Sequence, residues 1–282
     1  MLRNAFLWLT LGSLIPISSF ATVDSPVVQG LGGGGRAGVP REALFSNPAA
    51  VVAVGSTFGF VHYEIPQVPD FNARGRGWSV GIYDVGDQTW KGGFAYTRTS
   101  KARILNAQQS YVDRSSFRFA TGHAITGSII GGLRGRLERI HGAGDGTKYF
   151  DADLGILFPF FNDIRAGFTI ENVADKDLEE PRTIGLGAAY SLGYGIQFLA
   201  DGYRIMTGKK EGERGWSLSF ELGLAGDFLA RAGVFEEAFR ALKGWSAGLS
   251  WMGPRASFDY ALKVTGRGPR ERAHILGMTL AL

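Results

Sequence analysis

A two-residue alternation of apolar and polar side chains runs through most of the chain after about residue 55. It is clearest over residues 150–158, 164–171, 216–224, 257–264 and 276–282. Successive side chains of a β-strand point to opposite faces, so this pattern predicts strands with one apolar and one polar face. No convincing amphipathic helix interrupts the pattern, and we therefore expect an all-β fold.

Repeated along the chain, the alternation and the turn residues between its runs define fourteen candidate strands. We predict them at residues 55–65, 76–86, 89–100, 111–125, 128–142, 148–160, 163–174, 182–192, 194–206, 214–226, 227–239, 242–253, 255–266 and 271–282. Their number is even, and the last one runs to the final residue.

The connections between these strands alternate in length. Tight turns rich in Gly, Asn, Asp and Pro lie at residues 85–88, 126–127, 161–162, 192–193, 226–227 and 253–254. The intervening connections, such as residues 66–75, 101–110, 175–181 and 207–213, are mostly longer and more polar. Short turns on one side and longer loops on the other are typical of outer-membrane barrels.

A membrane environment explains why such a sheet must close. In hydrocarbon every backbone N–H and C=O group needs an internal partner, so the strands must form a barrel without edges. Five tryptophans near the predicted strand ends fit an interfacial aromatic girdle: Trp78, Trp90, Trp216, Trp245 and Trp251. We therefore predict a transmembrane antiparallel β-barrel of about fourteen strands in the bacterial outer membrane. Periodicity alone leaves a soluble all-β sandwich as the alternative.

The first 21 residues have the features of a secretory signal peptide. Arg3 supplies the positive charge, residues 5–17 are mostly apolar, and Ser19 and Ala21 place small residues before a cleavage site at Thr22. A single membrane anchor is the alternative, although the apolar stretch is short for one and contains a proline. We therefore expect residues 1–21 to direct export.

Composition excludes several classes of function. The chain has no cysteine and only four histidines, which excludes disulfide scaffolds, thiolate metal sites and thiol nucleophiles. With so few candidate ligands we expect no metal, and we expect no cofactor. We also expect no nucleic-acid partner, because the net charge of +4 is modest and the positive charges are dispersed along the chain. No serine has a catalytic signature around it, so we expect no enzyme. His123 and His274 lie on predicted strands and are expected to pack at the interface or in the lumen.

Residues 22–54 differ from the rest of the chain. A glycine-rich stretch at 30–38 precedes residues 40–50, which contain Asn47-Pro48-Ala49. Glycine permits close approach to a wall, while proline fixes a dihedral angle, so the segment suits a compact plug. A disordered tail is the alternative. The glycine spacing also matches a dinucleotide-binding fingerprint, but that motif requires a preceding strand and a following helix, which we do not expect here.

At this point the sequence resembles the FadL family of outer-membrane transporters for long-chain fatty acids and other hydrophobic compounds. It is equally similar to the PorV-like relatives of that family. Those proteins open, after the signal peptide, with a glycine-rich stretch, a small-residue segment and an Asn-Pro-Ala motif. The resemblance implies a fourteen-stranded barrel, here residues 55–282, with residues 22–54 folded inward as a lumenal hatch. The residues we assign to the hatch are Gly32, Gly35, Phe45, Asn47, Pro48 and Ala49.

If the apolar faces of the strands contact lipid, the charged faces line the lumen. A charge on the lipid face would cost roughly 2–4 kcal/mol near the bilayer midplane. We therefore predict twelve lumen-lining residues: Arg134, Arg136, Glu138, Asp151, Asp153, Arg165, Glu171, Asp201, Glu221, Arg231, Asp259 and Lys263. Ion pairs across neighbouring strands are expected between the arginines at 134 and 136 and the aspartates at 151 and 153. These charges form a polar conduit, hold the hatch, or simply neutralise one another.

Two functions fit these expectations. The first is passive passage of small hydrophobic or amphipathic molecules, gated by the hatch. The second is a PorV-like barrel that moves no solute and docks a secretion or cell-surface machine. The expected partners are outer-membrane lipid together with a hydrophobic small molecule in the first case or a protein in the second.

Overall fold

A computed structural model describes residues 25–67, 75–86, 89–105, 108–142, 144–161, 163–175, 181–193, 195–208, 210–238, 242–266 and 271–282. The predicted signal peptide at residues 1–21 lies outside the described residues, as do residues 22–24 of the predicted hatch.

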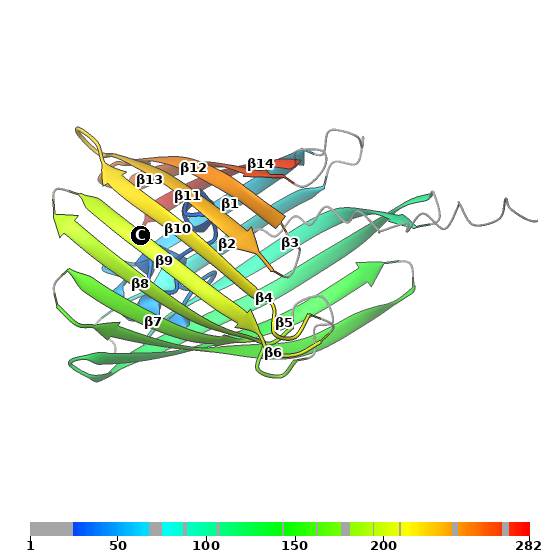
Figure 1. Cartoon of the computed structure of the whole chain (residues 1–282), viewed down its shortest axis with the longest axis horizontal. Coiled ribbons are helices and arrows are strands. Elements are labelled where there is room, and N and C mark those ends of the chain that lie inside the picture. Colours follow the sequence, from blue (N-terminus) through cyan, green and yellow to red (C-terminus); the bar gives the residue numbers. More distant parts are fainter. Residues whose placement is uncertain are drawn as a thin grey trace, which may run out of the picture.

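Fourteen antiparallel strands form one closed barrel (Figure 1). They are β1 (Phe58–Gln67), β2 (Arg76–Asp84), β3 (Lys91–Leu105), β4 (Gln108–Thr126), β5 (Ile129–Gly142), β6 (Gly144–Pro159), β7 (Ile164–Glu171), β8 (Thr183–Gly193), β9 (Ile196–Ile205), β10 (Arg214–Gly223), β11 (Phe228–Glu237), β12 (Leu242–Met252), β13 (Ala256–Thr265) and β14 (Glu271–Ala281). Each strand pairs with its neighbours in sequence, and β1 closes the barrel on β14 from Phe58↔Ala281 to Gln67↔Arg272. The prediction of a fourteen-stranded antiparallel barrel is confirmed.

One predicted loop is wrong. Residues 101–110 were expected to form a polar connection, but β3 continues to Leu105 and β4 begins at Gln108. The hairpin between β5 and β6 is also tight, because β5 ends at Gly142 and β6 begins at Gly144. Strands β3 to β6 have 14 to 19 residues, whereas β7 has 8. Polar side chains do not prevent ladder pairing of the backbone, and a period-two apolar pattern does not report strand extensions that lack it.

The outer wall is apolar. Large side chains that alternate with buried ones, such as Leu218, Phe220 and Leu276, are 43–52% exposed. All five tryptophans predicted for the girdle are also exposed. Burial of the intervening polar side chains is the expected pattern for a barrel whose outer face contacts lipid. None of the helices within the described residues is long and apolar enough to cross a membrane.

His123 and His274 both pack against aromatic side chains. His123 stacks on Trp90 and lies 2.9 Å from the Thr89 carbonyl oxygen. His274 lies 2.8 Å from the Tyr260 hydroxyl. These contacts give each ring a packing role.

Residues 25–54, called here the N-terminal segment, lie inside the barrel (Figure 1, blue). The segment contains α1 (Pro26–Gly30), η1 (Pro40–Glu42) and η2 (Pro48–Ala53). Each of these short helices has proline in its first turn, where a missing N–H costs nothing. Ser25 caps α1 by accepting from Val27 N and Val28 N, and Asn47 caps η2 by accepting from Ala49 N.

Candidate functional site

Glycines on three adjacent strands allow the N-terminal segment to touch the wall. A Cβ atom at Gly132 of β5 would lie 2.3 Å from the Ala49 nitrogen. At Gly155 of β6 it would lie 2.0 Å from Asn47 Oδ1, and at Gly167 of β7 it would lie 1.7 Å from the Arg36 carbonyl oxygen. Real Cβ contacts are essentially never this short, so the segment approaches the wall backbone here only because these three residues lack side chains.

Asn47 ties the N-terminal segment to β6 and to itself. Its side-chain amide nitrogen donates to the Arg36 carbonyl oxygen at 2.8 Å and to the Ile156 carbonyl oxygen at 3.1 Å. Its Oδ1 atom accepts from the Ala49 nitrogen, and the side chain is completely buried. Three of the residues assigned to the hatch, Asn47 with Pro48 and Ala49, therefore lie against the wall glycines.

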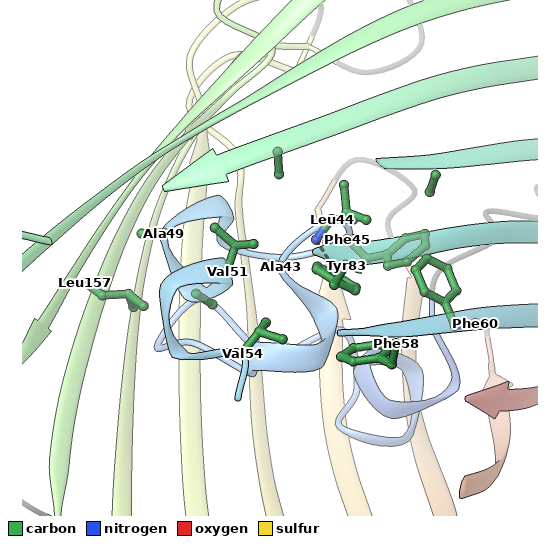
Figure 2. Close-up of a cluster of buried hydrophobic side chains, with 13 residues drawn as sticks. Ala43, Leu44, Phe45, Ala49, Val51, Val54, Phe58, Phe60, Tyr83 and Leu157 are labelled. Carbon is green, nitrogen blue, oxygen red and sulfur yellow. Dashed lines mark hydrogen bonds between the residues drawn. The ribbon is translucent and has the colours of Figure 1, made fainter. Parts of the chain in front are cut away.

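Phe45 belongs to an apolar cluster between the N-terminal segment and β1–β4 (Figure 2). Its ring meets Phe60 edge-on at a centroid distance of 5.7 Å and lies 5.4 Å from the His62 ring. The neighbouring Leu44 nitrogen donates to the Tyr83 hydroxyl at 2.9 Å. The cluster comprises Ala43, Leu44, Phe45, Ala49, Ala50, Val51, Val54, Phe58, Phe60, Tyr83, Ala95, Ala120 and Leu157. This side of the lumen is thus filled by hydrocarbon.

The glycine-rich stretch approaches the opposite wall. Gly32 and Gly35 have φ angles of +67° and +143°, which side chains rarely allow. The Asp201 carboxylate on β9 accepts from Gly35 N at 3.0 Å and from Arg36 N at 2.8 Å. A carboxylate accepting from two adjacent backbone N–H groups is a strong, charge-assisted anchor.

Arg36 was not predicted as a site residue, yet its side chain joins the N-terminal segment to β7 and β9. Its guanidinium pairs with Glu171 of β7 at 2.9 Å and lies over the Tyr203 ring of β9 at 5.1 Å. Its Nε donates to Thr169 at 3.2 Å. The sequence did contain a signal for this role. Arg36 is the one charged residue of the glycine-rich stretch at 30–38, and that stretch was expected to enter a lumen lined by acidic side chains.

A buried ion-pair network covers β4 to β6. Arg134 binds Asp153 at 2.6 Å and donates to the Ser46 carbonyl oxygen of the N-terminal segment at 2.9 Å. Arg136 lies 3.3 Å from the same aspartate. Asp151, which was expected to pair with an arginine, instead accepts from the Ala174 nitrogen. Glu138 binds Arg114, a residue that the sequence analysis missed because its pairing partner depends on strand register.

A second network covers β10 to β13. Arg231 binds Glu221 at 2.6 Å and also the Ser250 hydroxyl, which donates to Asp259. Lys263 pairs with Glu237, which was not predicted. Of the twelve residues predicted to line the lumen, ten lie in these contacts or in those of Asp201 and Glu171. Within the described residues, Asp151 accepts from the backbone nitrogens of Ala152 and Ala174, and Arg165 is half-buried on β7.

Every strand of the barrel contributes a residue close to the N-terminal segment. In strand order from β1 to β14 they are Phe60, Tyr83, Lys91, Gly122, Arg134, Ile156, Thr169, Gly185, Asp201, Ser217, Gly233, Ser246, Ser257 and Gly277. The segment is therefore held around the whole circumference of the lumen.

An apolar groove of about 550 Å³ lies on the outer wall. It runs over β1 and β11 to β14, and its lining includes Val61, Leu249, Trp251, Phe258 and Leu276. These side chains are exposed on the face that meets lipid. Within the described residues, no group of three or more His, Asp or Glu side chains is placed to hold a metal ion.

Neither a family model nor a curated protein matches this sequence. Solved structures do match it in fold. CymD, a monoaromatic hydrocarbon channel, superposes with a TM-score of 0.76 and 12% identity over 94% of this chain and 99% of its own. A FadL homologue from Pseudomonas aeruginosa gives 0.73 and 9% over 94% and 99%. The toluene transporter TbuX from Ralstonia pickettii gives 0.69 and 11% over 92% and 98%.

At sequence identities of 9–12%, these superpositions show a shared fold alone. The chain has the fold of FadL-type barrels of the bacterial outer membrane, and the resemblance seen in the N-terminal motif is confirmed at that level. These structural neighbours are transport proteins rather than enzymes.

Proposed function

We propose that the barrel is a passive outer-membrane passage for small hydrophobic or amphipathic molecules, and that residues 22–54 form the hatch that gates it. The observation that carries the proposal is the N-terminal segment held inside the lumen by contacts with all fourteen strands. A barrel closed in this way admits a solute only when part of the segment moves. Structural neighbours described as a hydrocarbon channel and toluene transporters support the choice of solute.

The apolar cluster gives a hydrophobic solute its means of opening the hatch. An aromatic or aliphatic molecule that takes the place of Ala43 in this cluster gains about 25 cal/mol for each Å² of apolar surface it buries. The same contact between hatch and wall is lost, so the solute favours the displaced state by its differential affinity. Downhill diffusion then completes passage, and the mechanism needs no cofactor or energy source.

The buried ion pairs of the wall help to close the lumen to water and ions. Arg134 and Asp153 are almost completely buried, and separating such a pair leaves an uncompensated charge. A hydrophobic solute has no means of replacing either partner. The charged half therefore stays in place during passage, and the apolar half between Phe45 and β1–β4 is the route.

A non-transporting barrel that docks a secretion or surface machine is the competing function. The ion-paired lumen is the observation that favours it, because a filled lumen suits a scaffold as well as a closed gate. The two functions differ in whether solute crosses, and a direct uptake measurement separates them.

The experiment uses toluene as the probe and cells that carry the full-length barrel in their outer membrane. Initial uptake is compared with that of cells lacking the barrel, and a hydrophilic disaccharide is measured in parallel. Faster toluene uptake with unchanged disaccharide uptake supports the proposal. Toluene uptake equal to that of cells lacking the barrel, when the barrel is folded in the membrane, excludes passage and favours the scaffold.

A further inference from the structure

The wall holds the N-terminal segment unevenly. Residues 30–37 are bound through Ser246 to the Gly30 carbonyl and through Asp201 to Gly35 and Arg36. Residues 44–54 are bound by the hydrogen bonds of Tyr83, Arg134, Ile156 and Lys91. These two stretches form a frame fixed by directional contacts on opposite sides of the lumen.

Residues 38–43, called here the arc, connect the two parts of the frame. Backbone bonds of the arc are local, from Gly38 N to the Gly35 carbonyl and from Glu42 N to the Val39 carbonyl. Among the described residues, the polar contacts of the arc with the wall come from Arg41, 3.4 Å from Ser257 Oγ and 3.3 Å from the Met252 sulfur. The contact with Ser257 is long and partly exposed, and the contact with Met252 is exposed and made to a weak sulfur acceptor, so the arc is the weakest attachment of the segment.

The ends of the arc allow it to move. Gly38 has a φ angle of +90°, a conformation in which glycine rotates at little steric cost. Its wall contact is the apolar side chain of Leu157, which offers no directional bond. Ala43 at the other end is completely buried in the apolar cluster. Apolar packing is non-directional and is replaced readily by a hydrophobic solute.

Glu42 is the chemically unusual residue of the arc. Its side chain is hydrogen-bonded to Ser25, and within the described structure its Oε2 atom has no hydrogen-bond partner. Around it lie the negative Asp259, the positive Arg231 and Arg41, and the Tyr83 phenol. Burial, with the neighbouring Asp259 adding to it, raises the pKa of Glu42 from its ordinary 4.5 to about 8.

We propose that the arc is the moving part of the hatch, and that the protonation state of the Glu42 carboxyl controls its movement. The inference rests on the proposed function only in taking residues 22–54 as the gate. The neutral carboxyl is favoured in this buried position, because burial and Asp259 disfavour the carboxylate by more than Ser25, Arg231 and Arg41 stabilise it. Within the described structure the Oε2 atom also has no hydrogen-bond partner to stabilise a charge. Proton loss therefore favours the displaced arc, in which Glu42 meets water.

The direction of the pH dependence follows from linkage. In the displaced arc the pKa of Glu42 returns towards 4.5, while in the closed arc it is about 8. Between these values the closed state holds a proton that the displaced state has released. Closure is therefore strongest below pH 4.5 and weakens up to pH 8, with opening rising by up to about tenfold per pH unit.

Two buried alanines provide matched probes. The chain has no cysteine, so single substitutions Ala43→Cys in the arc and Ala49→Cys in the frame introduce one thiol each. Both native side chains are completely buried. Thiol labelling by a small maleimide is measured on the purified, folded full chain between pH 5 and 8, without any transported solute. Each probe is also measured with Glu42→Gln, so that the pH dependence of the thiol itself cancels in the ratio.

We expect the Ala43→Cys rate, divided by its rate in the Glu42→Gln background, to rise at least tenfold between pH 5 and 8. The corresponding ratio for Ala49→Cys should stay within twofold of one. Equal ratios for both probes, or a flat ratio for Ala43→Cys, would overturn the inference. Because labelling needs no transport, an arc that opens in a barrel that takes up no toluene would refute the proposed function alone.

Discussion

Asn47 of the N-terminal segment and Gly155 of β6 fit together because one has a side chain and the other has none. A Cβ atom at Gly155 would lie 2.0 Å from Asn47 Oδ1 and within 3 Å of the Pro48 ring. The amide of Asn47 passes this point to reach the Ile156 carbonyl oxygen. The position of the segment in the lumen thus depends on a missing side chain in the wall.

Gly155→Val should displace the N-terminal segment without opening the barrel. Added side-chain atoms in a packed site typically cost about 1–3 kcal/mol, and here they meet the Asn47 side chain and the Pro48 ring. We expect residues 25–54 to become sensitive to protease while the strands stay protected. Gly202→Val is the matched control, because its Cβ would meet nothing closer than 3.9 Å. Equal protease resistance in both variants would contradict this contact.

Asp201→Asn should loosen the glycine-rich stretch. The substitution removes the charge that strengthens the hydrogen bonds to Gly35 and Arg36, and such bonds contribute about 1.5–3 kcal/mol. We expect faster amide hydrogen exchange in residues 30–37, with little change in residues 44–54. Asp227→Asn, in an exposed turn, should leave both stretches unchanged. Unaltered exchange in Asp201→Asn would show that this carboxylate does not hold the segment.

Two arginines test the difference between buried and exposed ion pairs. Arg134→Met removes a partner of the buried Asp153, and we expect a loss of about 3–5 kcal/mol in the free energy of unfolding. Arg98→Met removes an exposed partner of Asp113, and a loss below about 1 kcal/mol is expected. Denaturant titration of the barrel in lipid vesicles measures both. Similar losses for the two variants would contradict the burial of the network.

Leu218 tests the lipid-facing register. The side chain is 52% exposed at the middle of β10. Leu218→Arg should therefore lower the free energy of unfolding in lipid by about 2–4 kcal/mol. Leu218→Phe serves as the control, since it keeps an apolar surface towards lipid, and it should have a much smaller effect. A tolerated arginine would place this face in water.

The barrel was predictable because lipid imposes one rule on every strand. Apolar side chains must alternate with buried polar ones, and this alternation located all fourteen strands. The rule applies only within the membrane, which is why the continuation of β3 to Leu105 and the start of β4 at Gln108 were missed. There the alternation of apolar side chains ends before the backbone ladder does.

The candidate site was predictable in composition but not in pairing. Asn47 and its neighbours could be assigned from their motif, and the inward charges from their alternation with apolar residues. The contacts of Arg36 with Glu171 and of Arg114 with Glu138 depend on how strands and segment are placed around a closed circumference. Arg36 and Glu171 are 135 positions apart and Arg114 and Glu138 are 24 apart, and no local pattern encodes either meeting.

Uptake by cells whose barrel carries both Asn47→Ala and Asp201→Asn tests the gating claim most directly. These substitutions remove the anchors on opposite sides of the lumen. We expect the unaltered barrel to accelerate toluene uptake alone, and the double variant to accelerate both toluene and disaccharide uptake, because its hatch no longer closes. If the folded double variant admits both solutes no faster than the unaltered barrel does, residues 22–54 do not gate this barrel.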